Sequence, residues 1–221
     1  MPSHTEENYL KAIFTLNSSG VGATTNAIAE RMETKASSVS DMLKRLKTKK
    51  LVIYQKYKAV RLSEEGKKLA IAIIRKHRLW EFFLVEKLNF KWDEVHEIAE
   101  QLEHIQSPEL TNKLEVYLDF PKVDPHGDPI PDKHGNFPLH LSETLEDCLP
   151  NSKAIIIGVK DHSVEFLKYL DKLHIGLGTK IEILTINAFD QSLEVSIEEV
   201  QDHFSISKEV ARNLYIKIVE A

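Results

Sequence analysis

Apolar and polar residues alternate with a helical period along the first part of the chain. Residues 6–16 place apolar side chains three or four positions apart, as a helix that packs against a core does: Tyr9, Leu10, Ile13, Phe14 and Leu16. Residues 24–32 and 37–47 repeat this pattern, and a short polar turn at 33–36 separates them. Two short helices joined by a tight turn form a helix-turn-helix, so we expect three helices before residue 50.

The pattern changes to that of β-strands immediately afterwards. Residues 51–54 and 59–62 are rich in β-branched and other apolar side chains, and the four residues between them include two lysines. Two such runs with a short connection predict a β-hairpin. A hairpin that follows a helix-turn-helix is a wing, so we predict a winged helix-turn-helix for the first domain.

A second set of helices follows the hairpin. Ser63 and two acidic residues are typical of a helix start, and we expect this helix to end near Leu88. Its second half is apolar nearly all round, so it is either deeply buried or paired with another subunit: Trp80, Phe82, Phe83, Leu84 and Val85. We expect another helix over 96–104, capped by Asp93, and one over 109–119 after Ser107.

The last third of the chain changes character again. Residues 120–150 include five prolines between Pro121 and Pro138, which predict turns rather than regular structure. From residue 153 onward the pattern predicts short strands at 153–159, 180–186, 193–196 and 215–219, with a helix at 163–173. We therefore expect a small barrel-like β domain at the C-terminal end, and a mainly α chain before it.

Composition narrows the class of protein. The chain has 221 residues, enough for two or three small domains, and it holds no apolar run long enough to cross a bilayer. Its first residues are polar and acidic, unlike a signal peptide. The single cysteine, Cys148, excludes an internal disulfide and is expected to be incidental rather than a ligand. We therefore expect a cytoplasmic protein that does not contact a membrane.

The net charge of −5 hides an asymmetry along the chain. Residues 1–78 hold 16 Lys and Arg and 7 Asp and Glu, whereas the remainder holds 13 and 27. A basic first third predicts a polyanionic partner. Short polar side chains at the start of the third helix suit base edges, and the cations after them suit phosphates. The candidate DNA-binding residues are Ser37, Ser38, Ser40, Asp41, Lys44, Arg45, Lys47, Lys56 and Lys58. The alternative is a solvated basic face that contacts proteins.

A stripe of possible metal ligands follows the predicted helix over 96–104. If these residues are helical, one face carries His96, Glu100, Glu103 and His104. His77 and Glu81 have the same spacing of four on the preceding helix. Imidazoles and carboxylates at these positions suit a divalent cation. The alternative is a solvated polar face. The protease motif His-x-x-Glu-His is absent, because position 100 is Glu.

Several short motifs together resemble one known family. They are Glu7-Asn-Tyr-Leu, Arg75-Lys-His-Arg-Leu, Val95-His-Glu, Glu103-His, and the stretch from Phe120 through Gly127-Asp-Pro-Ile-Pro. The chain resembles the diphtheria-toxin-repressor (DtxR/MntR) family of metal-dependent repressors over nearly its whole length. The resemblance implies a winged helix-turn-helix domain over 1–72, a helical metal-binding and dimerisation domain over 73–140, a linker over 141–152, and a C-terminal SH3-like (FeoA-like) barrel over 153–221.

The resemblance also implies two metal sites. The primary site would use Asn8, Glu100, Glu103 and His104. The ancillary site would use His77, Glu81 and His96, with help from the C-terminal domain, for which Glu165 is the candidate. Two positions depart from the family's branches. Glu100 replaces the cysteine of the iron-sensing branch, and Asn8 and Lys11 replace an Asp and a Glu of the manganese-sensing branch.

The expected function follows from the resemblance and from the donor atoms. A site with an amide oxygen, two carboxylates and an imidazole, and without sulfur, suits Mn²⁺ or Fe²⁺ better than Zn²⁺ or copper. We expect a homodimeric repressor that binds operator DNA of metal-homeostasis genes when Mn²⁺, rather than Fe²⁺, locks its domains. We expect neither an enzyme nor a small-molecule substrate. The alternatives are an Fe²⁺-dependent repressor, a hydrolytic metalloenzyme, and a winged-helix protein that acts through protein partners around a structural metal.

Overall fold

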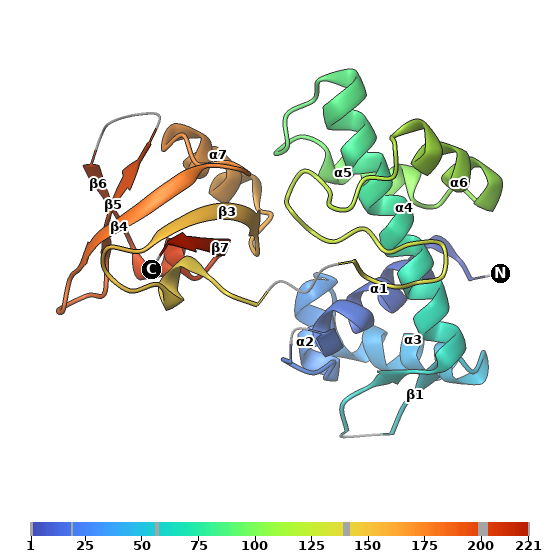
Figure 1. Cartoon of the computed structure of the whole chain (residues 1–221). Coiled ribbons are helices and arrows are strands. Elements are labelled where there is room, and N and C mark those ends of the chain that lie inside the picture. Colours follow the sequence, from blue (N-terminus) through green and yellow to red (C-terminus); the bar gives the residue numbers. More distant parts are fainter. Residues whose placement is uncertain (1, 19, 56–57, 139–141, 199–202, 221) are drawn as a thin grey trace. The chain divides into compact units, whose positions relative to one another are not determined.

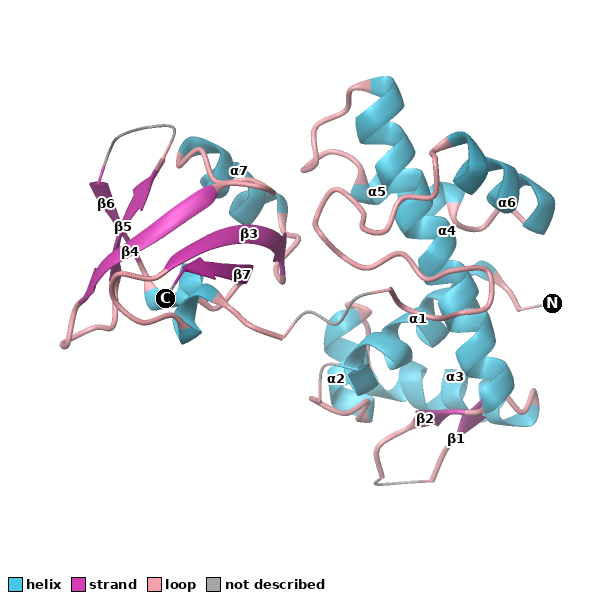
Figure 2. Cartoon of the chain, viewed as in Figure 1, coloured by secondary structure: helices cyan, strands magenta, loops and turns pink. Residues whose placement is uncertain are grey.

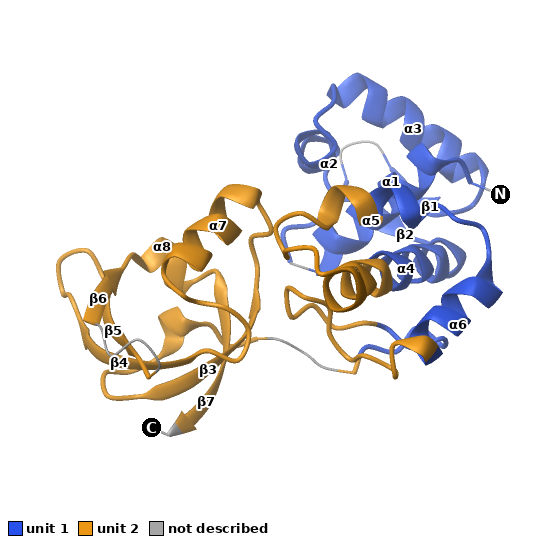
Figure 3. Ribbon diagram, turned by 90° about the horizontal axis from the view of Figure 1, so that it is seen from above, with its two compact units in different colours: residues 1–77, 100–116, 131–137 blue, residues 78–99, 117–130, 138–221 orange. Residues whose placement is uncertain are grey.

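The structure is a computed structural model, which describes residues 2–18, 20–55, 58–138, 142–198 and 203–220. The chain divides into two compact units, shown in Figure 3. Unit 1 comprises residues 1–77, 100–116 and 131–137, and unit 2 comprises residues 78–99, 117–130 and 138–221. Unit 1 is mainly helical, and most of the strands belong to unit 2; Figure 2 shows the helices and strands in different colours. None of the described helices is long and apolar enough to span a membrane.

The predicted winged helix-turn-helix is confirmed in unit 1. It is built from helices α1 (His4–Ser18), α2 (Thr25–Arg31) and α3 (Ala36–Thr48) and strands β1 (Val52–Ile53) and β2 (Arg61–Leu62). The Thr24 hydroxyl accepts a hydrogen bond from the Ala27 amide and so caps α2. The strands pair antiparallel, with two paired residues each instead of the four expected. Leu10, Ile13, Ile28, Leu43 and Leu46 are fully buried between the three helices.

The long helix α4 (Glu64–Leu88) belongs to both units. Ser63 caps it as predicted, because its hydroxyl accepts a hydrogen bond from the Gly66 amide at 3.0 Å. Gly66 also permits a close approach to the hairpin: a Cβ atom at this position would lie 2.0 Å from the Leu51 carbonyl oxygen. The N-terminal turns of α4 therefore pack directly against the start of the wing, and Ala70 joins the core of the winged helix.

Two shorter helices follow, and the first one corrects a prediction. Helix α5 (His96–Leu102) ends two residues early, so Glu103 and His104 lie in the turn after it rather than on its face. Asp93 lies three residues before α5 and does not cap it; one Asp93 carboxylate oxygen lies 3.8 Å from Lys168 Nζ instead. Helix α6 (Pro108–Tyr117) begins with proline, whose fixed φ suits a first helical residue.

The segment after α6 is irregular, as predicted, but it is not a loose linker. The Asp124 carboxylate accepts hydrogen bonds from the amides of His126 and Asp128, and Asp132 does the same for His134 and Asn136. Asp124, His126 and Ile130 are buried. Two tight turns with defined positions, at 124–128 and 132–136, therefore order this segment, and Pro125 lies within the first.

The C-terminal part of unit 2 is an antiparallel five-stranded sheet in the order β6-β5-β4-β3-β7 (Figure 1). The strands are β3 (Lys153–Val159), β4 (Lys180–Ile186), β5 (Leu193–Ile197), β6 (His203–Ile206) and β7 (Leu214–Glu220), and the single-turn helix η1 (Leu145–Asp147) precedes them. Helix α7 (Val164–Lys172) packs on the sheet through Leu167 and Leu170, and α8 (Lys208–Ala211) is a single turn. The expected barrel is wrong in one respect: over the described residues, β6 and β7 do not pair, so the sheet is open.

Candidate metal centres and nucleic-acid interface

Helix α1 and the turn after α5 bring together one polar cluster in unit 1, which we call the Glu103 cluster. Its members are Glu7, Asn8 and Lys11 from α1, His77 from α4, and Glu100, Glu103 and His104. Glu7 and Lys11 are one helical turn apart and therefore lie on the same side of α1. Residues more than 85 positions apart in sequence thus meet through direct side-chain contacts.

Glu103 lies at the centre of this cluster, and its side chain is 0% exposed. Its carboxylate accepts two hydrogen bonds of 2.8 Å from Lys11 Nζ, which also lies 3.2 Å from Glu100 Oε1. His77 Nδ1 lies 2.6 Å from Glu103 Oε2. Burial raises the pKa of Glu103, but the hydrogen bond with His77 and the charge of Lys11 outweigh it and hold the pKa below its ordinary value. Glu103 is therefore ionised at neutral pH.

His104 is oriented by α1. Its Nδ1 lies 2.6 Å from Glu7 Oε2, and the other Glu7 oxygen accepts a hydrogen bond from the Gln106 amide group. The His104 ring stacks on the His4 ring with 4.3 Å between centroids. If Nδ1 carries the ring proton and donates a hydrogen bond to Glu7, Nε2 has a free lone pair. Nε2 lies 3.9 Å from Glu103 Oε1. His104 thus presents a possible ligand atom toward the Glu103 carboxylate.

The donor set of the Glu103 cluster fits a divalent cation. The Asn8 side-chain oxygen is buried without a hydrogen-bond partner among the described residues, as a ligand atom awaiting a cation would be. Two carboxylates and one imidazole complete a set of the kind that Mn²⁺ and Fe²⁺ accept. Of the four residues expected for the primary site, Glu100 and Glu103 share Lys11 as a partner, His104 lies 3.9 Å from Glu103, and Asn8 lies on α1 between Glu7 and Lys11. Glu7 and His77 contact the ligands directly, which the sequence did not suggest for this site.

A second cluster lies in unit 2 around Glu81, whose side chain is 3% exposed. His96 Nδ1 lies 3.3 Å from Glu81 Oε1, and His77 precedes Glu81 by one turn on α4. The irregular segment supplies two more groups: Glu81, Asp124 and His126 are all buried and offer ligand atoms within 4.8 Å of one another. Sequence reasoning missed Asp124 and His126, because the contact between their turn and α4 is tertiary.

His126 is held so that one ring nitrogen faces the carboxylates. Its Nε2 lies 2.9 Å from the Trp92 carbonyl oxygen, so Nε2–H donates to it, and Nδ1 lies 3.7 Å from Glu81 and 3.9 Å from Asp124. Nδ1 is buried without a hydrogen-bond partner among the described groups. Burial lowers the pKa of His126, but Glu81 and Asp124 outweigh it and raise this pKa to about 9. Burial, with the charges of Asp128 and Glu81, also raises the pKa of Asp124.

The C-terminal domain meets this second cluster through histidine rather than through the expected glutamate. The His162 ring, which precedes α7, stacks on the His126 ring with 4.6 Å between centroids. Glu165, in the first turn of α7, is exposed and is not part of the group formed by Glu81, Asp124 and His126. Arg78 pairs with Asp128 at 2.6 Å and stabilises the same turn.

The candidate DNA-binding residues lie mostly on the exposed side of α3 and the wing. Ser37, Ser38, Asp41, Lys44, Arg45, Lys47 and Lys58 are exposed, and Ser40 is half-buried. Asp41 and Lys44 pair at 2.9 Å, so part of the positive charge of Lys44 is compensated. Lys56 lies outside the described residues. The opposite side of α3 contributes Val39, Leu43 and Leu46 to the core, which fixes the polar side toward solvent.

Comparison with known families assigns each part of the chain. Residues 1–60 match "Iron dependent repressor, N-terminal DNA binding domain", residues 63–132 match "Iron dependent repressor, metal binding and dimerisation domain", and residues 143–218 match "FeoA domain". The iron-dependent repressor IdeR of Mycobacterium tuberculosis is 37% identical over 127 residues, which cover 58% of this chain and 55% of IdeR. The chain thus matches about half the length of this curated relative.

Solved structures match the chain over nearly its whole length. A manganese-dependent transcriptional repressor in complex with manganese is 31% identical, with a TM-score of 0.88, 97% of this chain covered and 100% of that chain. ScaR with bound Cd²⁺ is 30% identical, with a TM-score of 0.81, 99% of this chain covered and 100% of that chain. With all three domains matched in order, the chain belongs to the DtxR/IdeR family of iron- and manganese-dependent repressors.

Proposed function

We propose that this chain is a metal-dependent, DNA-binding transcriptional repressor that acts as a homodimer in the cytoplasm. One observation carries the proposal: α1, which packs in the core of the winged helix, meets Glu103 and His104 in a cluster whose donor atoms suit a divalent cation. The family consists of transcriptional repressors, so the hydrolytic alternative has no support.

The Glu103 cluster can couple metal binding to DNA binding. A divalent cation held by Asn8, Glu100, Glu103 and His104 would supply positive charge that joins α1 to the turn after α5. Because α1 shares its buried core with α3, fixing α1 also fixes the recognition helix. Two recognition helices held in this way by a dimer can enter successive major grooves. The cation favours the DNA-binding state only by its higher affinity for that state.

We propose Mn²⁺, rather than Fe²⁺, as the activating metal. The Glu103 cluster offers oxygen and imidazole nitrogen and no sulfur. The similar structures include a manganese-dependent repressor and the manganese regulator SloR, whereas the curated relatives include the iron-dependent IdeR.

We propose Glu81 as the centre of the ancillary site, with partners drawn from His77 and His96 or from Asp124 and His126.

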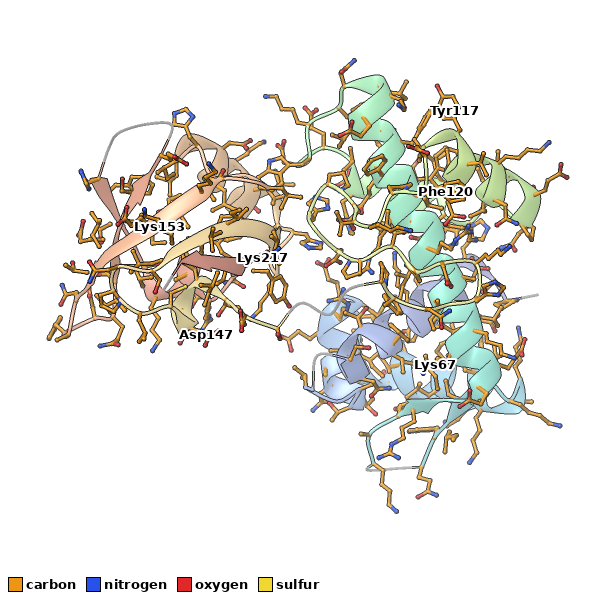
Figure 4. The ribbon with its side chains drawn as sticks, in the orientation of Figure 1. Lys67, Tyr117, Phe120, Asp147, Lys153 and Lys217 are labelled. Atoms are coloured by element: carbon orange, nitrogen blue, oxygen red, sulfur yellow. The ribbon has the colours of Figure 1, made fainter. Side chains whose placement is uncertain are left out.

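Exposed apolar side chains support a dimer. Tyr117 and Phe120, at and just after the C-terminal end of α6, are 65% and 50% exposed (Figure 4). Val116 and Leu88 are also more than half exposed. The apolar residues of the second half of α4, predicted to be either deeply buried or paired with another subunit, are partly exposed: Trp80, Phe82, Phe83 and Val85. Exposed apolar residues of this size are typical of a subunit interface.

The decisive experiment selects DNA from a random-sequence pool under anaerobic conditions with Mn²⁺, Fe²⁺, Zn²⁺ or no metal, and measures affinity by fluorescence anisotropy. We expect Mn²⁺ to tighten binding to selected DNA and Glu103→Gln to abolish this stimulation while the dimer stays folded. Glu97→Gln, at an exposed position of α5, is the matched control and should behave as the wild type. Selected DNA that binds equally well without metal would contradict the proposal and favour a structural role for the metal.

A further inference from the structure

Lys11 places a positive charge between the two carboxylates of the Glu103 cluster. Its Nζ lies 2.8 Å from each oxygen of Glu103 and 3.2 Å from Glu100 Oε1. An ammonium group has three donors, and three acceptor oxygens surround this one. The two carboxylates that would bind a metal are therefore already bridged by a positive charge that belongs to the chain.

Burial makes this compensation necessary. The Glu103 side chain is 0% exposed and the Lys11 side chain is 16% exposed. An ionised carboxylate that is removed from water is strongly destabilised unless an opposite charge pairs with it. His77 also contacts Glu103, and Lys11 contacts both Glu100 and Glu103. Lys11 therefore stabilises the metal-free protein.

The same contact opposes metal binding. A divalent cation and an ammonium group cannot both lie within bonding distance of the same carboxylate oxygens, because like charges at that separation repel strongly. The lysine side chain is long and flexible, and its position on α1 is close enough to the surface for the ammonium group to move into water. Displacement of Lys11 is then part of the cost of metal binding.

We propose that Lys11 is an internal competitor of the activating metal: it bridges Glu100 and Glu103 in the metal-free protein, leaves when a divalent cation binds, and so sets the metal concentration at which the repressor responds. The inference rests on the proposed metal centre and deepens it. It also gives the metal-free state a defined structure, since Lys11 ties α1 to the turn after α5 without a metal. Loss of Lys11 should lower stability in the absence of metal and raise metal affinity.

The test compares wild type with Lys11→Met, which keeps most of the side-chain length and removes the charge. Mn²⁺ binding is measured by titration calorimetry and by the electron paramagnetic resonance signal of free Mn²⁺, and thermal unfolding is measured with and without Mn²⁺. We expect Lys11→Met to bind one equivalent of Mn²⁺ at least tenfold more tightly. Its metal-free form should unfold at a lower temperature, and Mn²⁺ should raise its unfolding temperature by more than in the wild type.

Two control variants separate displacement from a general electrostatic effect. Lys76 is half-buried in the same unit, and the charges of Glu7 and Glu103 act on it. In the part of the chain that the structure describes, no hydrogen bond or ion pair joins Lys76 to either of them, so Lys76→Met should change Mn²⁺ affinity much less. Lys11→Arg keeps the charge and should bind Mn²⁺ no more tightly than the wild type. If the wild type binds Mn²⁺ and Lys11→Met binds it equally tightly or more weakly, the inference about Lys11 is overturned, while the proposed metal centre stands. If neither protein binds Mn²⁺, the proposed metal centre fails with it.

Discussion

Glu7 controls how His104 faces the candidate metal centre. The Glu7 carboxylate lies 2.6 Å from His104 Nδ1 and also accepts a hydrogen bond from Gln106, so it is itself fixed in place. A carboxylate at one ring nitrogen selects the tautomer whose other nitrogen can bind a metal, and it makes that nitrogen a stronger donor. We therefore expect Glu7 to act through His104 rather than as a ligand.

Glu7→Gln should weaken Mn²⁺ binding roughly 10- to 100-fold, because the amide cannot hold the imidazole by charge as the carboxylate does. Calorimetric titration of the metal-free protein measures the change. Glu6→Gln is the matched control, since Glu6 is equally buried on α1 but contacts Ser3 and Lys49 instead of His104. Equal losses in both variants would mean that Glu7 acts through the stability of α1.

His126 makes the stability of the metal-free protein depend on pH. Its pKa is raised from 6.5 to about 9 in the folded protein, so its stabilising contribution is complete below pH 6.5 and is lost as the pH rises through about 9. The raised pKa of Asp124 acts in the same direction, because the folded state keeps a proton that the unfolded state has released. The loss from His126 is at most about 3 kcal/mol.

Urea unfolding of the metal-free protein at pH 6.5 and pH 9 tests this expectation. The free energy of unfolding should fall over this range in the wild type and should fall less in His126→Gln. His203 is exposed on β6, and His203→Gln should leave the pH dependence unchanged. A wild-type stability that rises between these two pH values would show that His126 is neutral in the folded protein.

Among the elements, those with a strong local period were predictable. The strands at 153–159 and 180–186 have the predicted bounds, and α4 ends at Leu88 as expected. The early end of α5 was not predictable from polar periodicity, since Glu103 and His104 fit a continued helix equally well. The chain instead closes a turn, in which the Ile105 amide donates to the Leu102 carbonyl oxygen, and Pro108 prevents one continuous helix.

Elements that depend on distant contacts were missed. Strand β6 has only two apolar residues in four and α8 is a single turn, so neither has a local signal, and both are defined by packing on the sheet. The same limit applies to the sites. The sequence placed Glu100, Glu103 and His104 together, but it could not show that Lys11 bridges two of them. Which side of α1 meets the turn after α5 is decided by tertiary packing.

At the scale of the whole molecule, the separation of charge along the chain predicts which part of the protein contacts DNA. The first 78 residues hold 16 of the 29 Lys and Arg residues, whereas the rest of the chain is acidic. Acidic surfaces are repelled by phosphates, so we expect only the winged helix to contribute favourable contacts with the DNA backbone. A dimer presents two such surfaces and doubles each contact.

Lys47→Ala should therefore weaken binding of the Mn²⁺-loaded protein to all DNA sequences by a similar factor, because we expect this exposed lysine of α3 to contact phosphate rather than bases. The slope of the logarithm of affinity against the logarithm of salt concentration should decrease by about two per dimer, about one for each lost contact. Fluorescence anisotropy at several salt concentrations measures both quantities. Lys217→Ala, at an exposed position of β7 (Figure 4), should change neither. A Lys47→Ala dimer with an unchanged salt slope but altered sequence preference would instead place this residue at a base edge.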